Sequence, residues 1–175
     1  KIPNLVDSVS KFINELIGVA ATSTKERLTP PVKPEDLAAL LDQMEADGRH
    51  DLRLATGLIA LFGLRPAELA VLTTKGDKLY AGAVKRNIAT LAQKAKPPRR
   101  CLPLDIAGRE GEGKRLLQLY SSGLVKLPAA VLNEISKVDS KGTFKEVGHA
   151  FSQLLKRYEP WKNLVRSNPD TTTYS

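Results

Sequence analysis

One segment constrains the fold more than any other. Within residues 51–62 almost every residue from Ala55 onward is apolar, so a helix there has no polar face. Such a helix is typical of the buried centre of a domain. Gly63 is a common residue at a helix end, and Pro66 is well suited to open the next helix. The sequence therefore predicts a central helix around which other elements pack, followed by a short helix through residue 72.

Helical spacing of apolar residues recurs on both sides of this segment. Residues 4–20 and 34–46 each predict an amphipathic helix, and the polar, proline-containing residues between them predict a linker. Two parts follow: residues 1–33, a helix with its linker, and residues 34–175, a domain. Further helical spacing is found at residues 116–120, 131–138 and 144–158.

Two segments have strand character instead. Residues 78–87 and 100–104 are short and strand-like, and the basic loop between them could close a small antiparallel sheet. The predicted fold class is therefore mainly α (α+β), a helical domain with a small antiparallel sheet.

Composition excludes several classes of function. The longest apolar stretch, residues 54–64, is about half of the roughly 20 residues that a membrane span needs, and no signal peptide opens the chain. We therefore expect a cytoplasmic protein that does not enter a membrane. Cys101, His50 and His149 form no cluster at metal-ligand spacing, so neither a metal nor another cofactor is expected. Cys101 and Trp161 are expected to be packing residues.

Positive charge is concentrated in one part of the chain. The formal net charge is +8, which favours polyanionic partners. Residues 75–100 carry eight Lys or Arg residues against one acid, Asp77. This segment is the expected contact with double-stranded DNA. Its cations are Lys75, Lys78, Lys85, Arg86, Lys94, Lys96, Arg99 and Arg100.

An arginine stands where the buried helix ends. Arg65 follows Gly63-Leu64 and directly precedes the next predicted helix. A guanidinium can grip two phosphate oxygens, and a helix start adds backbone N–H groups and a positive dipole end. Glu68 could either cap that helix or hold the guanidinium in place, and an ordinary surface ion pair is the alternative.

This arginine motif resembles one of a known family. Residues 56–72, and above all Gly63-Leu64-Arg65 with Glu68-Leu69, resemble the first arginine motif of the tyrosine recombinases, the phage integrase family. Pro66 is a departure, because the family commonly has a small or β-branched residue there. The family motif is followed by a three-stranded sheet with a lysine in a strand turn and by an Arg-x-x-Pro-Leu-like strand. Lys85 and residues 100–104 are similar to these.

The resemblance implies roles for these residues in DNA recombination through a 3′-phosphotyrosine link. Arg65 would grip the scissile phosphate, Glu68 would support it, and Lys85 would act as general acid at the leaving 5′ oxygen. Arg86, Lys94 and Lys96 are alternatives to Lys85. Together with three further cations of the segment, they are otherwise expected to contact the DNA backbone. These are Lys75, Arg99 and Arg100.

The end of the chain adds to the resemblance. Residues 169–175 are similar to the lead-in to the family's second box, His-x-Leu-Arg-His, with Tyr174 at the first histidine position. By this alignment the second arginine and the nucleophilic tyrosine lie past Ser175, and residues 1–33 are the tail of the family's core-binding domain. Tyr80, Tyr120 and Tyr158 are then packing residues. The chain alone is expected to bind DNA as a monomer without cutting it, whereas the whole protein would act as a tetramer.

Two other interpretations compete with this one. Residues 108–114 match the first seven positions of a phosphate-binding loop of nucleotide hydrolases. Arg115 at the magnesium-ligand position and the acids Glu110 and Glu112 oppose that interpretation and favour a polar loop. The second alternative is a helical DNA-binding or assembly module without chemistry, which the same basic segment would serve.

Overall fold

A computed structural model describes residues 32–84, 96–138 and 144–168 of the chain. The predicted helix at residues 4–20, Lys85, Arg86 and Lys94 lie outside the described residues. The elements are the helices α2 (Pro34–Ala46), α3 (His50–Phe62), α5 (Glu112–Ser122), α6 (Ala129–Ser136), α7 (Lys145–Arg157) and α8 (Glu159–Ser167), the 3-10 helix η1 (Pro66–Val71), and the strands β1 (Leu72–Lys75), β2 (Lys78–Ala81) and β3 (Arg99–Cys101).

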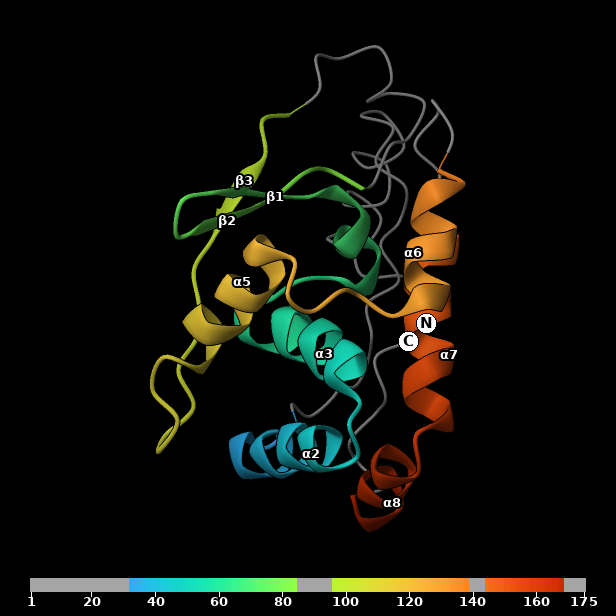
Figure 1. Cartoon of the computed structure of the whole chain (residues 1–175). Coiled ribbons are helices and arrows are strands. Elements are labelled where there is room, and N and C mark those ends of the chain that lie inside the picture. Colours follow the sequence, from blue (N-terminus) through green and yellow to red (C-terminus); the bar gives the residue numbers. More distant parts are fainter. Residues whose placement is uncertain (1–31, 85–95, 139–143, 169–175) are drawn as a thin grey trace, which may run out of the picture. The chain divides into compact units, whose positions relative to one another are not determined.

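Helix α3 is the centre of the fold, as its apolar sequence predicts. Nine of its residues are buried, and it contacts α2, α5, α7 and η1 (Figure 1). Its approach to α5 is close: a Cβ added at Gly57 would lie 2.2 Å from Cδ1 of Leu116. Glycine at this position therefore leaves room for the Leu116 side chain to pack directly on the α3 backbone.

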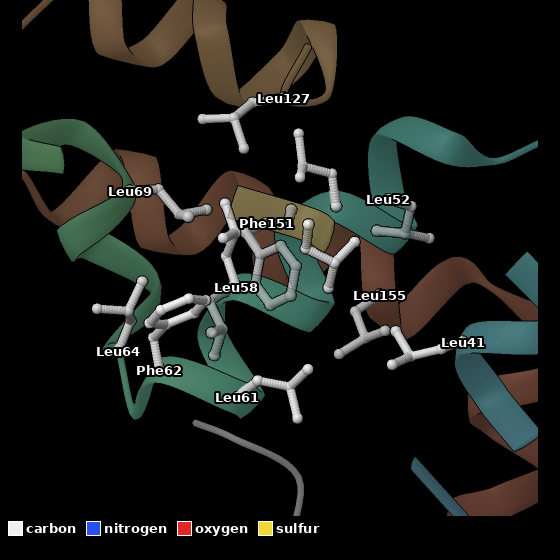
Figure 2. Close-up of a cluster of buried hydrophobic side chains, with 14 of the residues drawn as sticks. Leu41, Leu52, Leu58, Leu61, Phe62, Leu64, Leu69, Leu127, Phe151 and Leu155 are labelled. Carbon is white, nitrogen blue, oxygen red and sulfur yellow. The ribbon is translucent and has the colours of Figure 1, made fainter. Parts of the chain in front are cut away.

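The core gathers the apolar sides of these helices. Phe151 of α7 projects among leucines that come from several elements (Figure 2). Val147 and Leu155, one turn before and after Phe151, are also buried, which is the spacing of an amphipathic helix. The partner elements of α7 are η1, α6, α8 and α3.

The predicted fold class is confirmed in outline: the described chain is mainly helical with one three-stranded antiparallel sheet, in the order β1-β2-β3. The helix at residues 34–46 is confirmed, and α3 begins one residue before its predicted start. The helix predicted from Pro66 through Leu72 is a 3-10 helix that ends at Val71, because Leu72 already has extended backbone and begins β1.

Two elements were not predicted from the residue pattern. Strand β1 is only four residues long, and its alternation of half-buried and exposed residues is too short to stand out in the sequence. Helix α8 begins at Glu159 with Pro160 in its first turn. Trp161 of α8 is buried, as expected of a packing residue. Within the described residues, no helix combines the length and the hydropathy that crossing a membrane requires.

Tyr158, at the junction of α7 and α8, links these two helices to the end of α2. Its hydroxyl donates a hydrogen bond of 2.7 Å to Asp47, which caps the end of α2. Burial, and then this hydrogen bond, raise the pKa of Tyr158 well above its usual value. The same bond, with a second one from Gln43, lowers the pKa of Asp47.

The variant Tyr158→Phe tests this link through pH. At pH 7 it should be less stable by about 1 kcal/mol, the usual contribution of one hydrogen bond. The extra stability that Tyr158 gives over phenylalanine is fully present below about pH 10, the ordinary pKa of a tyrosine. It is lost as the pH rises through the higher pKa of the folded state, because the unfolded chain releases the proton first. Urea unfolding at pH 7 to 11 should show the difference shrinking, and a constant difference would contradict this account.

Candidate functional site

The turn that carries Arg65 is set by the end of α3. Gly63 has a left-handed backbone with φ of 59°, and Leu64 is buried and donates its N–H to the carbonyl of Ile59 at 2.9 Å. Arg65 follows in extended conformation as the N-cap residue of η1, and it is exposed. The buried leucine therefore anchors the chain directly before an arginine that faces solvent.

Glu68 holds this turn from inside. It is 6% exposed, and its Oε2 accepts the backbone N–H of Arg65 at 2.7 Å. In return the Glu68 N–H donates to the Arg65 carbonyl at 2.8 Å. Of the two roles predicted for Glu68, this is the capping role. Among the described residues, its carboxylate bonds to the Arg65 backbone and to the Arg99 guanidinium, not to the Arg65 guanidinium.

The ion-pair partner of Glu68 is Arg99 of β3. Its Nη2 donates to Glu68 Oε2 at 2.8 Å and to the carbonyl of Gly63 at 3.3 Å. Its Nη1 lies 3.3 Å from Sγ of Cys101. Arg99 thus ties the edge strand of the sheet to the Arg65 turn. Its side chain remains 49% exposed, so part of the guanidinium faces solvent.

Register explains why Arg99 points toward Glu68. Arg99 pairs with Ala81 on β2, and Cys101 pairs with Leu79. Residues two apart on a strand share a face, so Arg99 lies on the same face as the buried Ala81, Leu79 and Cys101. Burial raises the pKa of the Cys101 thiol, which keeps it protonated. Cys101 is therefore a buried small hydrophobe, as expected.

Arg65 lines a surface hollow of about 490 Å³. Its charged lining consists of Arg65, Lys96 and Arg99 against the single carboxylate of Glu68. The segment Ala81-Gly82-Ala83 also lines it, and these small residues leave room between the cations. The arrangement has the charge and the size to hold an anion such as a phosphate group.

The helix start offers fewer free backbone donors at Arg65 than its sequence predicts. Pro66 has no N–H, and the N–H groups of Arg65 and Glu68 are already used within the turn. The element that follows is a six-residue 3-10 helix, too short for a substantial dipole. Attraction for an anion at this hollow would come from side-chain cations.

Among the described residues, two of the predicted DNA contacts lie away from this hollow. Lys75 and Arg100 lie on the sheet and are exposed, but they are absent from the hollow's lining. Lys96 lines it. Lys85, Arg86 and Lys94 are outside the described residues, so the choice of strand-turn lysine stays a prediction.

In the segment that matches a phosphate-binding loop, backbone N–H groups are already hydrogen-bonded to carboxylates of the same chain. The Gly111 N–H donates to Asp105 at 3.1 Å, and the Gly108 N–H donates to Glu110 at 3.1 Å. Two amides that a phosphate would need are thus occupied, which disfavours the nucleotide interpretation.

Glu112, in the first turn of α5, has a structural role that sequence reasoning missed. It is 3% exposed and pairs with Arg53 of α3 and, at 2.6 Å, with Arg115. No local pattern signals this contact, because Arg53 and Glu112 are 59 residues apart. The pair ties α3 to α5 beside the Gly57 contact.

Neither histidine joins a site. His149 is exposed, although Val147 and Phe151 on the same helix are buried. His50 is also exposed, with Nδ1 3.5 Å from a Glu45 oxygen. Within residues 32–84, 96–138 and 144–168, no three His, Cys, Asp or Glu side chains are grouped as metal ligands.

Comparison with known proteins gives no relative: no family model, no curated protein and no solved structure matches this chain. The function is therefore argued from the hollow and its residues.

The Arg99–Glu68 pair should contribute strongly to stability. Arg99→Met removes the cation and leaves a buried carboxylate, so the free energy of unfolding should fall by about 1–3 kcal/mol. Adding Glu68→Gln should restore part of the loss, because a neutral amide is less costly to bury. Arg100→Met is the matched control: this neighbour is exposed, and its loss should cost less than about 0.5 kcal/mol. Equal losses in urea unfolding would contradict the assignment.

Proposed function

We propose that this chain is part of the catalytic domain of a tyrosine-type site-specific DNA recombinase, and that the hollow at Arg65 receives the scissile phosphate. One observation carries the proposal. An exposed arginine, held by its backbone on a buried glutamate, stands in a hollow with two further cations, Lys96 and Arg99. The resemblance of residues 56–72 to the family's first arginine motif supports the same role for Arg65.

The chemistry assigned to this hollow is electrostatic. In the family reaction a tyrosine oxygen attacks a DNA phosphorus, the 5′ oxygen leaves, and a 3′-phosphotyrosine link forms. The pentavalent intermediate gains negative charge, which cations fixed in advance stabilise. Arg65 would supply that charge. Glu68 would act on it indirectly, by holding the turn on which Arg65 stands.

The proton for the leaving 5′ oxygen would come from a lysine of the basic segment. Lys85 keeps that role by the resemblance. Lys96 is the one candidate for it among the described residues, and its place in the lining of the hollow is compatible with the role. The general acid is therefore proposed as Lys85, with Arg86, Lys94 and Lys96 as the alternatives to compare by substitution. The tetramer on DNA and the cytoplasmic location stay predictions.

The reading frame downstream provides the first test. Translation of the coding DNA beyond the Ser175 codon should give Leu-Arg-His at once and a tyrosine some tens of residues later. Unrelated residues at these positions would remove the basis for catalytic roles of Arg65 and Lys85. The non-catalytic DNA-binding module would then be the better account of the same cations.

A substitution at Arg65 in that longer protein separates catalysis from binding. Arg65→Ala should lower cleavage of a nicked duplex substrate by about 100-fold or more, the usual cost of removing a charge stabiliser. DNA affinity, measured by fluorescence anisotropy, should stay within a few fold. Arg65→Lys should remain strongly impaired, because an ammonium cannot make the two-oxygen contact.

Arg166→Ala is the matched control for this experiment. Arg166 is an exposed arginine of α8 that contacts Asn163 and lies away from the hollow's lining. It should leave both cleavage and affinity nearly unchanged. Parallel losses of affinity and cleavage in Arg65→Ala would indicate a binding residue without a catalytic role.

A further inference from the structure

The sheet register places a second group of cations on the face opposite Arg99. Thr73, Tyr80 and Arg100 lie side by side across the three strands, and Lys75 lies opposite Lys78 at the end of the β1–β2 hairpin. Side chains two apart on one strand share a face. These five residues therefore form one surface, called the outer sheet face here.

The other face of the sheet belongs to the core. Leu79, Ala81 and Cys101 are buried there, and Arg99 contacts Glu68 from the same side. Consecutive residues Arg99 and Arg100 thus serve different surfaces. The first lines the Arg65 hollow, whereas the second stands on the outer sheet face.

The cations of the outer sheet face are available to a partner. Lys75, Lys78 and Arg100 are exposed, and none of them forms a recorded ion pair with another described residue. Asp77, in the hairpin turn, is the one acid within residues 72–81. The Lys75 ammonium lies 5.8 Å from the centre of the Tyr80 ring, within the range of a cation–π contact. This contact keeps a positive charge close to the middle strand.

We propose that the outer sheet face is a second nucleic-acid surface, at which Lys75, Lys78 and Arg100 contact phosphodiester groups around Tyr80. The inference rests on the proposed function for its partner, DNA, but uses no residue in the lining of the Arg65 hollow. Neighbouring strands are roughly 5 Å apart, so one polynucleotide strand can reach cations on all three.

The chemistry of this face favours a polynucleotide over other anionic partners. Its non-basic members are Thr73 and the half-buried Tyr80, so it has no aliphatic side chain to insert into a lipid layer. An aromatic ring among cations on a sheet suits a sugar or base between phosphates. Duplex and single-stranded DNA share the phosphodiester groups, and the experiment below separates them.

The test uses the 175-residue chain with three cations neutralised together, Lys75→Gln, Lys78→Gln and Arg100→Gln. Binding to a labelled duplex and to one of its strands is followed by fluorescence anisotropy over a series of salt concentrations. The Kd for at least one of the two DNAs should rise tenfold or more. The slope of log Kd against log salt should fall by about 2 to 3, because each lost phosphate contact removes about 0.7 to 0.9.

A matched control removes the same charge elsewhere. Lys114, Lys126 and Lys156 are exposed and lie outside the sheet, so changing all three to Gln keeps the net charge equal to that of the test variant. This control should change Kd by no more than about threefold. Equal losses in both variants would overturn the proposal, since net charge alone would then explain binding. If the triple variant unfolds at a lower urea concentration than the unchanged chain, Lys78→Glu repeats the test, because it reverses a single charge at the end of a strand.

Tyr80→Leu distinguishes the form of DNA. If bases stack on the ring, single-strand affinity should fall about tenfold while duplex affinity changes little. If the face binds duplex backbone, Tyr80→Leu should leave duplex affinity within about threefold, while the triple variant still lowers it. A chain that binds neither DNA would overturn both this inference and the proposed function. Normal affinity of the triple variant, beside a cleavage defect of Arg65→Ala, would overturn this inference alone.

Discussion

The site depends on one buried carboxylate. Glu68 accepts the backbone N–H of Arg65 and pairs with Arg99, which also donates to the carbonyl of Gly63, so these contacts join the end of α3, the start of η1 and strand β3. A buried carboxylate is costly unless such partners surround it. The three elements must therefore meet for Glu68 to be tolerated, and their meeting is also what forms the hollow.

The core makes that meeting possible. Helix α3 is buried on most sides, and Gly57 leaves room for the Leu116 side chain of α5 on its backbone. The ion pair of Glu112 with Arg53 holds the same two helices together. A rigid α3 gives its last turn, and therefore Arg65, a defined position. An anion-binding arginine benefits from this because preorganised charge needs little rearrangement when the ligand arrives.

Two cation groups with different surroundings result from one short sheet. Arg99 is partly occupied by Glu68, whereas Arg100, Lys75 and Lys78 stand on the opposite face with Tyr80. For a DNA-binding protein this separates two tasks. A few cations in fixed positions can act on one phosphate. The larger group of exposed cations on the other face can contribute salt-dependent affinity.

The sequence by itself determined most of the local helices and indicated Arg65 as a candidate site residue. The apolar run of α3, its glycine end and the amphipathic spacing of α2 and α7 follow from periodicity, which is a local property. Strand β1 was missed because four residues carry too little pattern, and the histidine on α7 proved exposed. Only the tertiary structure decided that Arg99 is the partner of Glu68, and that Arg99 and Arg100 lie on opposite faces of the sheet. These depend on strand register and on contacts 31 residues apart, and no local pattern encodes either one.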